Sequence, residues 1–163
     1  KLDTRTYLTA ELTESEKLDL PSGKAMISYD DMYLGETYID GSGTLQNMTL
    51  TLGTDQRISV KREKMQDFSS TRLFGSDVKQ VFTFKITVKN NQKKEIKLTL
   101  KDQYPISTQK NIEVELLKET TPPTTNKADT GVLTWEDTFQ PGETKSYQIS
   151  YSVKYPKGMQ LNL

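Results

Sequence analysis

Glu113 and Glu115 are the two residues whose type and spacing come nearest to a catalytic pair. They lie two positions apart in the alternating run Ile112-Glu-Val-Glu-Leu116, so on a strand their carboxyl groups share one face about 7 Å apart. Glycosidases hold their two carboxyl groups about 5–9 Å apart, usually on different strands and in a groove. Because these two instead alternate with apolar residues, the pattern favours a solvated outward face over a glycosidase site.

Three tyrosines of the first half, Tyr29, Tyr33 and Tyr38, form the one candidate ligand platform. Aromatic rings on a strand can stack on sugar rings, and tyrosine is also a common half-buried residue of sheets. Packing is the favoured interpretation. The alternative is a carbohydrate-binding module that uses these rings or the exposed loop around Pro122-Pro123, in the Thr- and Pro-rich stretch 118–131, which we expect to be mobile.

Metal and cofactor sites are not predicted. The loop aspartates are Asp30, Asp31, Asp40 and Asp55. Their oxygens could bind Ca²⁺, but their spacing matches no calcium loop and aspartate is a common turn residue. The chain has no histidine and no cysteine, which excludes Ser-His-Asp and Cys-His sites and cysteine-based zinc sites. We therefore expect no catalytic residues, no cofactor, no metal and no enzymatic activity.

Charge gives no reason to expect nucleic acid or membrane as a partner. Lysine plus arginine and aspartate plus glutamate each total 22, so no net charge steers the chain onto a polyanion. Lys85, Lys89, Lys97 and Lys101 should form an outward basic face, but threonines rather than aromatic residues lie between them, which favours a role in solubility. No apolar run approaches the roughly 18–20 residues that span a bilayer, so we expect no direct membrane insertion by this fragment.

Strand patterns fill the chain from end to end. Phe82, Phe84, Ile86 and Val88 alternate with polar residues, as do Ile96, Leu98 and Leu100, and a polar turn lies between the two runs. This predicts a β-hairpin whose apolar face packs on Trp135 and on the strand of Tyr147–Tyr155. Further strands are predicted at 7–13, 25–29, 32–39, 45–52, 57–63, 112–116 and 132–139, with a tight turn at Asp30-Asp31 and either a bulge or a close backbone approach at Gly35.

The fold class is therefore all-β. About ten short strands at 8–15-residue spacing are typical of a β-sandwich. We predict a smaller N-terminal β-unit with a connector at residues 1–77, and an immunoglobulin-like β-sandwich at residues 78–163. Residues 64–77 show no clear period and are expected to connect the two units.

An ordered series of short segments resembles a known family. The segments are Leu20-Pro-Ser-Gly23, Tyr29-Asp-Asp-Met-Tyr-Leu-Gly35, Leu52-Gly-Thr-Asp-Gln-Arg-Ile-Ser-Val-Lys-Arg62, Ile86-Thr-Val-Lys-Asn90, Asp102-Gln-Tyr-Pro-Ile-Ser107, Gly131-Val-Leu-Thr-Trp135, Pro141-Gly-Glu143 and Tyr151-Ser-Val-Lys-Tyr-Pro156. The series is similar to the conserved C-terminal domain, of unknown function, of the mucoidy inhibitor A-like proteins.

The resemblance implies a periplasmic or cell-surface module of a larger bacterial protein, and the chain does open on Lys1 rather than on methionine. It supplies no catalytic residues. The hypothesis is a non-catalytic interaction or scaffolding domain with an unidentified protein partner in the cell envelope, and the alternative partner is a glycan.

Overall fold

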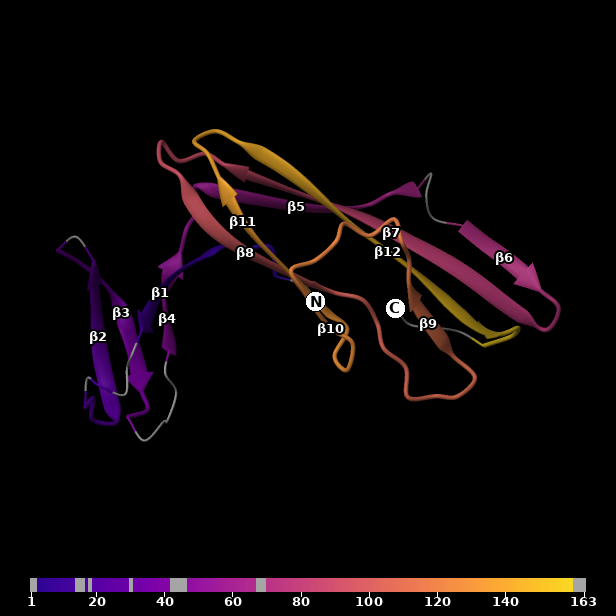
Figure 1. The fold of residues 1–163 in the computed structure, drawn as a ribbon, viewed down its shortest axis with the longest axis horizontal. Helices are drawn as coiled ribbons and strands as arrows, with labels where there is room; N and C mark the ends of the chain where they lie inside the picture. The colour runs from indigo at the N-terminus through magenta and orange to yellow at the C-terminus, as the bar shows by residue number, and fades with distance from the viewer. Residues whose placement is uncertain are drawn as a thin grey trace. The chain divides into compact units, whose positions relative to one another are not determined.

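The protein is built from β-strands alone in the part of the chain that the computed structural model describes, and strands account for 62% of it (Figure 1). The described residues are 3–13, 17, 19–29, 31–41, 47–66 and 70–159, with only the main chain described at 29, 32, 47, 48, 70 and 74. All-β was the predicted class, and it is confirmed. Two compact units divide the chain, Arg5–Gln56 and a larger one formed by Arg57–Leu163 with Lys1–Thr4.

The smaller unit holds two antiparallel strand pairs. They are β1 (Tyr7–Thr13) with β4 (Asn47–Thr54), and β2 (Gly23–Tyr29) with β3 (Met32–Ile39). The strands follow the predicted runs, although residues 45–46 of the predicted fourth strand lie outside the described residues. The β2–β3 hairpin turns at Asp31, whose φ of 59° is the left-handed conformation that such turns require.

The larger unit contains two antiparallel sheets. The five-stranded sheet has the order β5 (Ile58–Lys64), β7 (Asp77–Asn90), β12 (Thr144–Pro156) and β9 (Glu113–Leu116), and β6 (Ser70–Phe74) also pairs with β7. The three-stranded sheet has the order β10 (Thr125–Lys127), β11 (Val132–Phe139) and β8 (Ile96–Gln103). The two sheets face one another, as Figure 1 shows, and this sandwich is consistent with the predicted immunoglobulin-like architecture.

The core of the larger unit lies between its two sheets. Val88, Leu133, Phe139 and Ile149 are completely buried there, and the Trp135 and Tyr147 rings meet across the interface at a centroid distance of 5.6 Å. Burying each such side chain stabilises the fold by about 1.5–3 kcal/mol. Trp135 and the Tyr147–Tyr155 face of β12 are therefore core residues, as the alternation predicted.

The predicted central hairpin is wrong. β7 and β8 follow one another in sequence and yet belong to different sheets, because the chain crosses the sandwich between them. The crossing is held by Asn90, which is fully buried. Its amide nitrogen donates to the carbonyl oxygens of Lys94 and Gln140 at 2.9 and 3.1 Å, and its amide oxygen accepts from the Gln92 N–H at 2.9 Å. A buried amide satisfied in this way fixes the corner.

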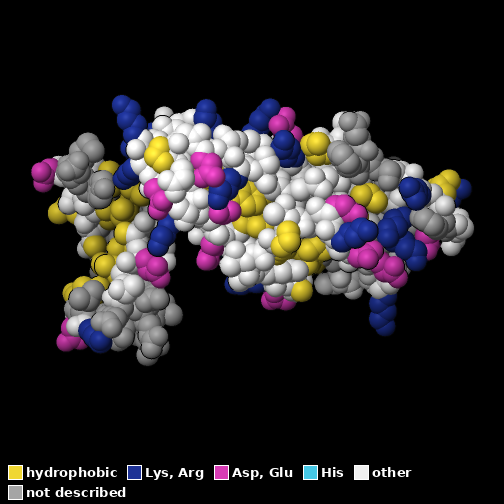
Figure 2. Space-filling model, turned by 45° about the horizontal axis from the view of Figure 1, so that its top comes forward, with side chains coloured by type: hydrophobic (Ala, Val, Ile, Leu, Met, Phe, Trp, Pro, Cys, Tyr) yellow, Lys and Arg dark blue, Asp and Glu magenta, His cyan; other side chains and the backbone are white. Residues whose placement is uncertain are grey.

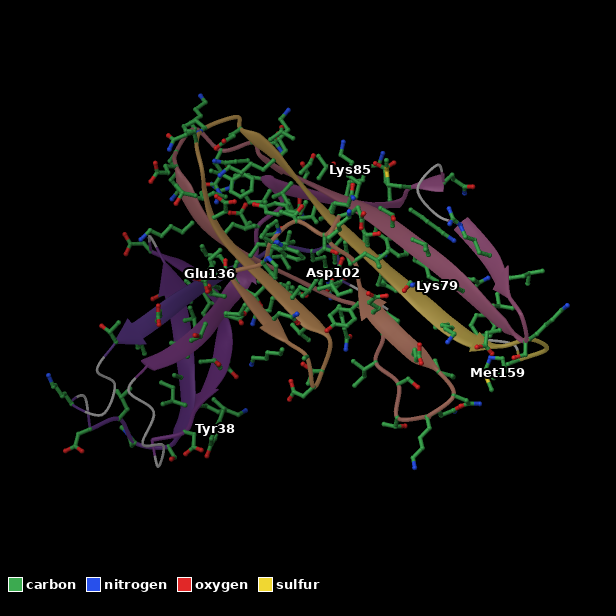
Figure 3. The ribbon with its side chains drawn as sticks, turned by 45° about the vertical axis from the view of Figure 1, so that its right-hand side comes forward. Tyr38, Lys79, Lys85, Asp102, Glu136 and Met159 are labelled. Carbon is green, nitrogen blue, oxygen red and sulfur yellow. The ribbon has the colours of Figure 1, made fainter. Side chains whose placement is uncertain are left out.

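The same crossing divides the predicted basic face. Lys85 and Lys89 lie on the five-stranded sheet, where Figure 3 labels Lys85 on β7, whereas Lys97 and Lys101 lie on the three-stranded sheet. Since all four side chains are exposed on sheets that face one another, the two pairs lie on opposite outer faces. No single basic face exists on a hairpin of these strands.

The boundary between the units also differs from the predicted division at residues 77 and 78. β5 pairs with the second half of β7 and β6 with its first half, so both strands belong to the larger unit and the division falls between Gln56 and Arg57. The sequence did not predict β6, because its five residues show no alternation. Among the described residues, no helix is long and apolar enough to cross a membrane.

Candidate functional site

A β-bulge in the smaller unit brings two of the predicted platform tyrosines onto one face. Ile27 pairs with Gly35 while Ser28 pairs with Tyr33, so Leu34 is an extra residue in β3. Tyr33 and Tyr38 are five positions apart and would point to opposite faces of a regular strand. The extra residue reverses that alternation, and both tyrosines therefore lie on one side of the sheet. Of the two predictions for Gly35, a bulge or a close backbone approach, the bulge is the one found beside it.

We call this side of the β2–β3 hairpin the tyrosine face. Its members are Lys24, Met26, Ser28, Tyr33, Glu36 and Tyr38. The three large side chains are strongly exposed, Met26 by 79%, Tyr33 by 63% and Tyr38 by 66%. Figure 3 labels Tyr38, and Figure 2 shows hydrophobic side chains gathered over the smaller unit. The predicted packing role therefore does not hold for Tyr33 and Tyr38, and the side chain of Tyr29 lies outside the described residues.

The reverse side of the hairpin supplies little core. Ile27 is the one buried apolar side chain among the described residues of the smaller unit, and Ala25 and Ile39 beside it are only partly buried. A two-stranded sheet alone is marginally stable in water. The described residues of this hairpin therefore leave three large side chains exposed on the tyrosine face and bury one apolar side chain behind it.

The Glu113–Glu115 pair lies on the outward face of β9, as the alternation favoured. Glu115 Oε2 is 3.2 Å from Lys79 Nζ, and Glu113 Oε2 is 3.6 Å from Lys154 Nζ. The side chains remain 65% and 71% exposed. A glycosidase acid needs an apolar pocket that keeps its carboxyl group protonated, and these carboxylates instead have lysine partners in contact with water. The arrangement does not resemble a carboxylate-pair active site.

A groove of about 710 Å³ runs along this outward face, between β6 and the segment that follows β9. Its lining includes Arg72, Val81, Glu115, Lys118 and Glu119, and the Lys79–Glu115 ion pair crosses it. The volume falls in the range of ligand pockets. Its walls mix both signs of charge, and no set of polar groups converges on one point, so the groove does not indicate a particular reaction.

A buried ion pair inside the sandwich was not predicted. Asp102 on β8 is 4% exposed, and its Oδ2 accepts a hydrogen bond of 2.8 Å from Nε of Arg62 on β5. The Arg62 guanidinium carbon lies 3.7 Å from the centroid of the Phe84 ring. The pair links the two facing sheets. The sequence did contain a signal for this pair, because Arg62 and Asp102 each occupy a position on the apolar side of an alternating strand.

Tyr151 lies near this pair and stacks on Phe82 and Phe84 at centroid distances of 5.4 and 6.2 Å. Burial raises the pKa of the Tyr151 hydroxyl, and the nearby Arg62 charge opposes that rise. Arg62 and Asp102 contact one another, and the Tyr151 ring contacts Phe82 and Phe84, so each residue of the cluster has its contacts within the sandwich. We therefore interpret Arg62 and Asp102 as an inter-sheet clamp rather than as a reactive site.

A second polar cluster joins β11 to β12. Lys145 Nζ donates to Asp137 Oδ1 at 2.5 Å, and the Tyr147 hydroxyl donates to Asp137 Oδ2 at 2.8 Å. These hydrogen bonds, that from Lys145 first, hold the pKa of the Asp137 carboxyl below its usual range. Burial, followed by the bond to Asp137, raises the pKa of Tyr147 well above its usual range. A tyrosine in this state is a hydrogen-bond donor and not a base.

The remaining predicted candidates do not come together. Asp30 lies outside the described residues, while Asp31, Asp40 and Asp55 follow three different strands. Among the described residues, no group of three or more histidine, cysteine, aspartate or glutamate side chains is placed to hold a metal ion. The stretch around Pro122-Pro123 is anchored rather than free, because Thr121 N–H donates to Gln148 O at 2.9 Å and the Trp135 indole N–H to Thr121 O at 3.1 Å.

Comparison with known proteins gives a family without an assigned activity. The family described as "Domain of unknown function (DUF4139)" matches residues 6–157. The chain is also similar to "Protein F37C4.5" of Caenorhabditis elegans, with 22% identity over 95% of the chain. It spans 30% of the length of that relative. No solved structure matches. The prediction of a conserved domain of unknown function is confirmed, and the link to the mucoidy inhibitor A-like proteins stays a prediction.

Proposed function

Since the chain belongs to the DUF4139 family, to which no activity is assigned, we propose that it is a non-catalytic interaction module of a larger protein. The relative that exceeds it about threefold in length supports the idea of a module within a longer chain. We place the module in a bacterial cell envelope, periplasmic or at the cell surface, on the resemblance to the mucoidy inhibitor A-like proteins alone. Its proposed partner there is a protein.

The tyrosine face is the observation that carries this proposal. Exposed apolar side chains scattered singly are ordinary, whereas several gathered on one face indicate an interaction surface. Met26, Tyr33 and Tyr38 are each more than 60% exposed on the same side of one hairpin. Lys24 and Glu36 lie among these side chains and form an ion pair of 4.0 Å. Tyrosine and methionine are enriched in protein interfaces relative to the rest of the surface.

Site-specific photo-crosslinking in cells tests the proposal. A photoreactive amino acid replaces Met26 in the full-length protein, and the control replaces Lys97 on the exposed face of β8. We expect a discrete adduct from position 26, weakened by Tyr33→Ser with Tyr38→Ser, and none from position 97. Equal labelling from both positions, or none from position 26, contradicts the proposal. So does turnover by the purified domain that one substitution abolishes.

Glycan binding is the second candidate, and one observation favours it. The bulge aligns Tyr33 and Tyr38 on one face, four residue pairs apart in the β2–β3 register, or about 13 Å by strand rise. Two exposed rings at this separation can stack on two sugar units of one chain. Calorimetric titration with envelope polysaccharide fragments tests it, with Tyr38→Ala as the variant. Absence of heat at millimolar sugar excludes this candidate, and binding that Tyr38→Ala weakens supports it.

A further inference from the structure

The four-residue strand β9 lies at the edge of the five-stranded sheet. It pairs with β12 on one side and with no described strand on the other (Figure 1). An edge strand presents unpaired main-chain groups on which another extended chain can add. Many domains bind partners in this way, by adding a strand from the partner to a sheet.

The register shows which main-chain groups of β9 are available. Leu117 N–H donates to Ser150 O at 2.8 Å, and Glu115 pairs with Ser152 and Glu113 with Lys154 in the same register. In an antiparallel pair, every second residue directs its N–H and C=O to the neighbouring strand. Val114 and Leu116 therefore direct theirs away from β12. Neither residue has a main-chain hydrogen bond with another described residue outside this ladder.

The two sides of this edge differ in chemistry. On the outward side, Glu113 and Glu115 are 71% and 65% exposed and lie in the row next to any added strand. Their lysine partners come from β12 and β7, on the opposite side of β9. On the core side, Val114 joins Pro105, Ile106, Ile112 and Val153 around a pocket of about 240 Å³, which Ser107, Thr108 and Gln109 complete, so its lining is mostly apolar. That volume accommodates one aliphatic side chain.

We propose that the edge of β9 binds an extended segment of a partner protein in which basic and apolar side chains alternate. A residue opposite Val114 shares its side of the sheet and would enter the apolar pocket, while residues opposite Glu113 and Glu115 would lie beside the carboxylates. The required pattern is basic–apolar–basic. This inference goes beyond the tyrosine face, because it concerns another surface in the other unit and names the chemistry of the partner segment.

A synthetic peptide is the probe. It is an octamer that alternates lysine and valine, with a fluorophore on its N-terminus and an amidated C-terminus, and its binding to the whole chain is followed by fluorescence anisotropy at low salt. We expect saturable binding. Replacing its lysines by glutamate should weaken binding about tenfold, since two cross-strand charge pairs are then reversed. Methylating the peptide nitrogens that face β9 should abolish binding, because those donors form the new ladder.

Val114→Pro in the protein tests the same contact from the other side. It deletes an N–H that points away from β12, so the existing ladder keeps its hydrogen bonds, as at other edge positions that tolerate proline. Val114→Ala is the matched control, which shortens the side chain but keeps the N–H. We expect Val114→Pro to lose the peptide and Val114→Ala to weaken it only slightly, with both variants retaining the circular-dichroism spectrum of the parent chain.

Glu113→Gln with Glu115→Gln keeps the test valid if Val114→Pro does not fold. This variant should bind the lysine peptide about tenfold more weakly. The proposal is overturned if the methylated peptide binds as well as the parent peptide, if it is the charge of the peptide alone that decides binding, or if no binding occurs at millimolar peptide. None of these outcomes depends on the tyrosine face, so the two proposals fail separately.

Discussion

The strand pair β7–β12 and the hairpin β2–β3 are both antiparallel pairs, and they differ most in what covers them. Five consecutive residues of β12, Ile149–Val153, are buried, so that strand is covered on both faces. Ser150, on the face away from the core, shares a 2.9 Å hydrogen bond with Thr83 and accepts another from Thr120 at its carbonyl. In β2–β3 every described side chain of one face is exposed, and on the other face Ile27 is the one buried side chain among those described.

This difference in burial indicates that one unit supplies the stability of the fold and the other supplies an exposed binding surface. Removal of apolar area from water is the dominant favourable term in folding, and among the described residues the fully buried apolar side chains all belong to the larger unit. Most of the exposed large hydrophobic side chains among the described residues belong to the smaller unit instead. We infer that the sandwich holds the fold together and that the hairpin is free to bind. The predictions below test this division, in order of decreasing effect.

The largest expected effect is that of a cavity in the sandwich. Phe139→Ala should destabilise the chain by about 3–5 kcal/mol, because the removed ring is completely buried between the sheets. Tyr38→Ala is the matched aromatic truncation on the tyrosine face and should change stability by less than about 0.5 kcal/mol. Urea unfolding followed by circular dichroism measures both. Similar losses in the two variants would contradict the division.

The inter-sheet clamp should have the next largest effect. Asp102→Ala leaves the Arg62 guanidinium between the sheets without its carboxylate, at a cost of about 3 kcal/mol, since the Arg62 side chain keeps 21% exposure. The control is Glu63→Ala, which breaks the exposed Lys61–Glu63 pair and should cost less than about 0.5 kcal/mol. Arg62→Met with Asp102→Leu should recover most of the loss. A double variant no more stable than Asp102→Ala would show that the pair is not replaceable by apolar packing.

The contribution of the Asp137 carboxylate to stability should depend on pH in the acidic range. Its folded-state pKa is lowered by Lys145 and Tyr147, so its stabilising contribution is present above the unfolded pKa of 3.8 and is lost as the pH falls through the folded value. The stability difference between the parent chain and Asp137→Asn should therefore be constant from pH 7 to 5 and narrow below about pH 4. Thermal melts across this range measure it. A difference that stays constant down to pH 2 would exclude a role of the carboxylate charge.

The smallest effects are expected on the outer faces of the sandwich. Lys97→Ser and Lys85→Ser should each change stability by less than about 0.5 kcal/mol, because both side chains are exposed. Since the two lysines lie on opposite faces, the double variant should be additive in a denaturation series. A coupling between them would indicate that the faces are not independent.

Strand alternation predicted where the strands lie better than it predicted which strands pair with one another. The runs around Phe84 and Leu100 were identified as strands, and they are strands, but their pairing as a hairpin was wrong. A short polar turn serves equally for a hairpin and for a crossing between two sheets. The hydrogen bonds of Asn90 with the chain around Gln140 favour the crossing over the hairpin. Because these residues are 50 positions apart, the local sequence pattern around Asn90 could not predict their contact.

The local sequence pattern likewise did not predict how the residues of the candidate sites are arranged. Gly35 indicated a bulge in the sequence, but that the bulge would turn Tyr33 to the side of Tyr38 depends on where the register shifts. The Arg62–Asp102 clamp was missed although each charge occupies an inward position of its alternating strand, because the pattern of one strand does not show which residue of a facing sheet lies opposite. Only their positions on facing sheets make them a pair.

By itself, the sequence determined the all-β class, the positions of most strands, the absence of histidine and cysteine chemistry, and Trp135 and the Tyr147–Tyr155 strand as core. These follow from residue types and from the two-residue period of a strand, which are local properties. Tertiary structure alone decided which strands pair, where the two units divide, which tyrosines stay exposed and which edge remains open. Those properties depend on contacts between distant residues, because the free energy of burial belongs to the whole packed sandwich and not to any single strand.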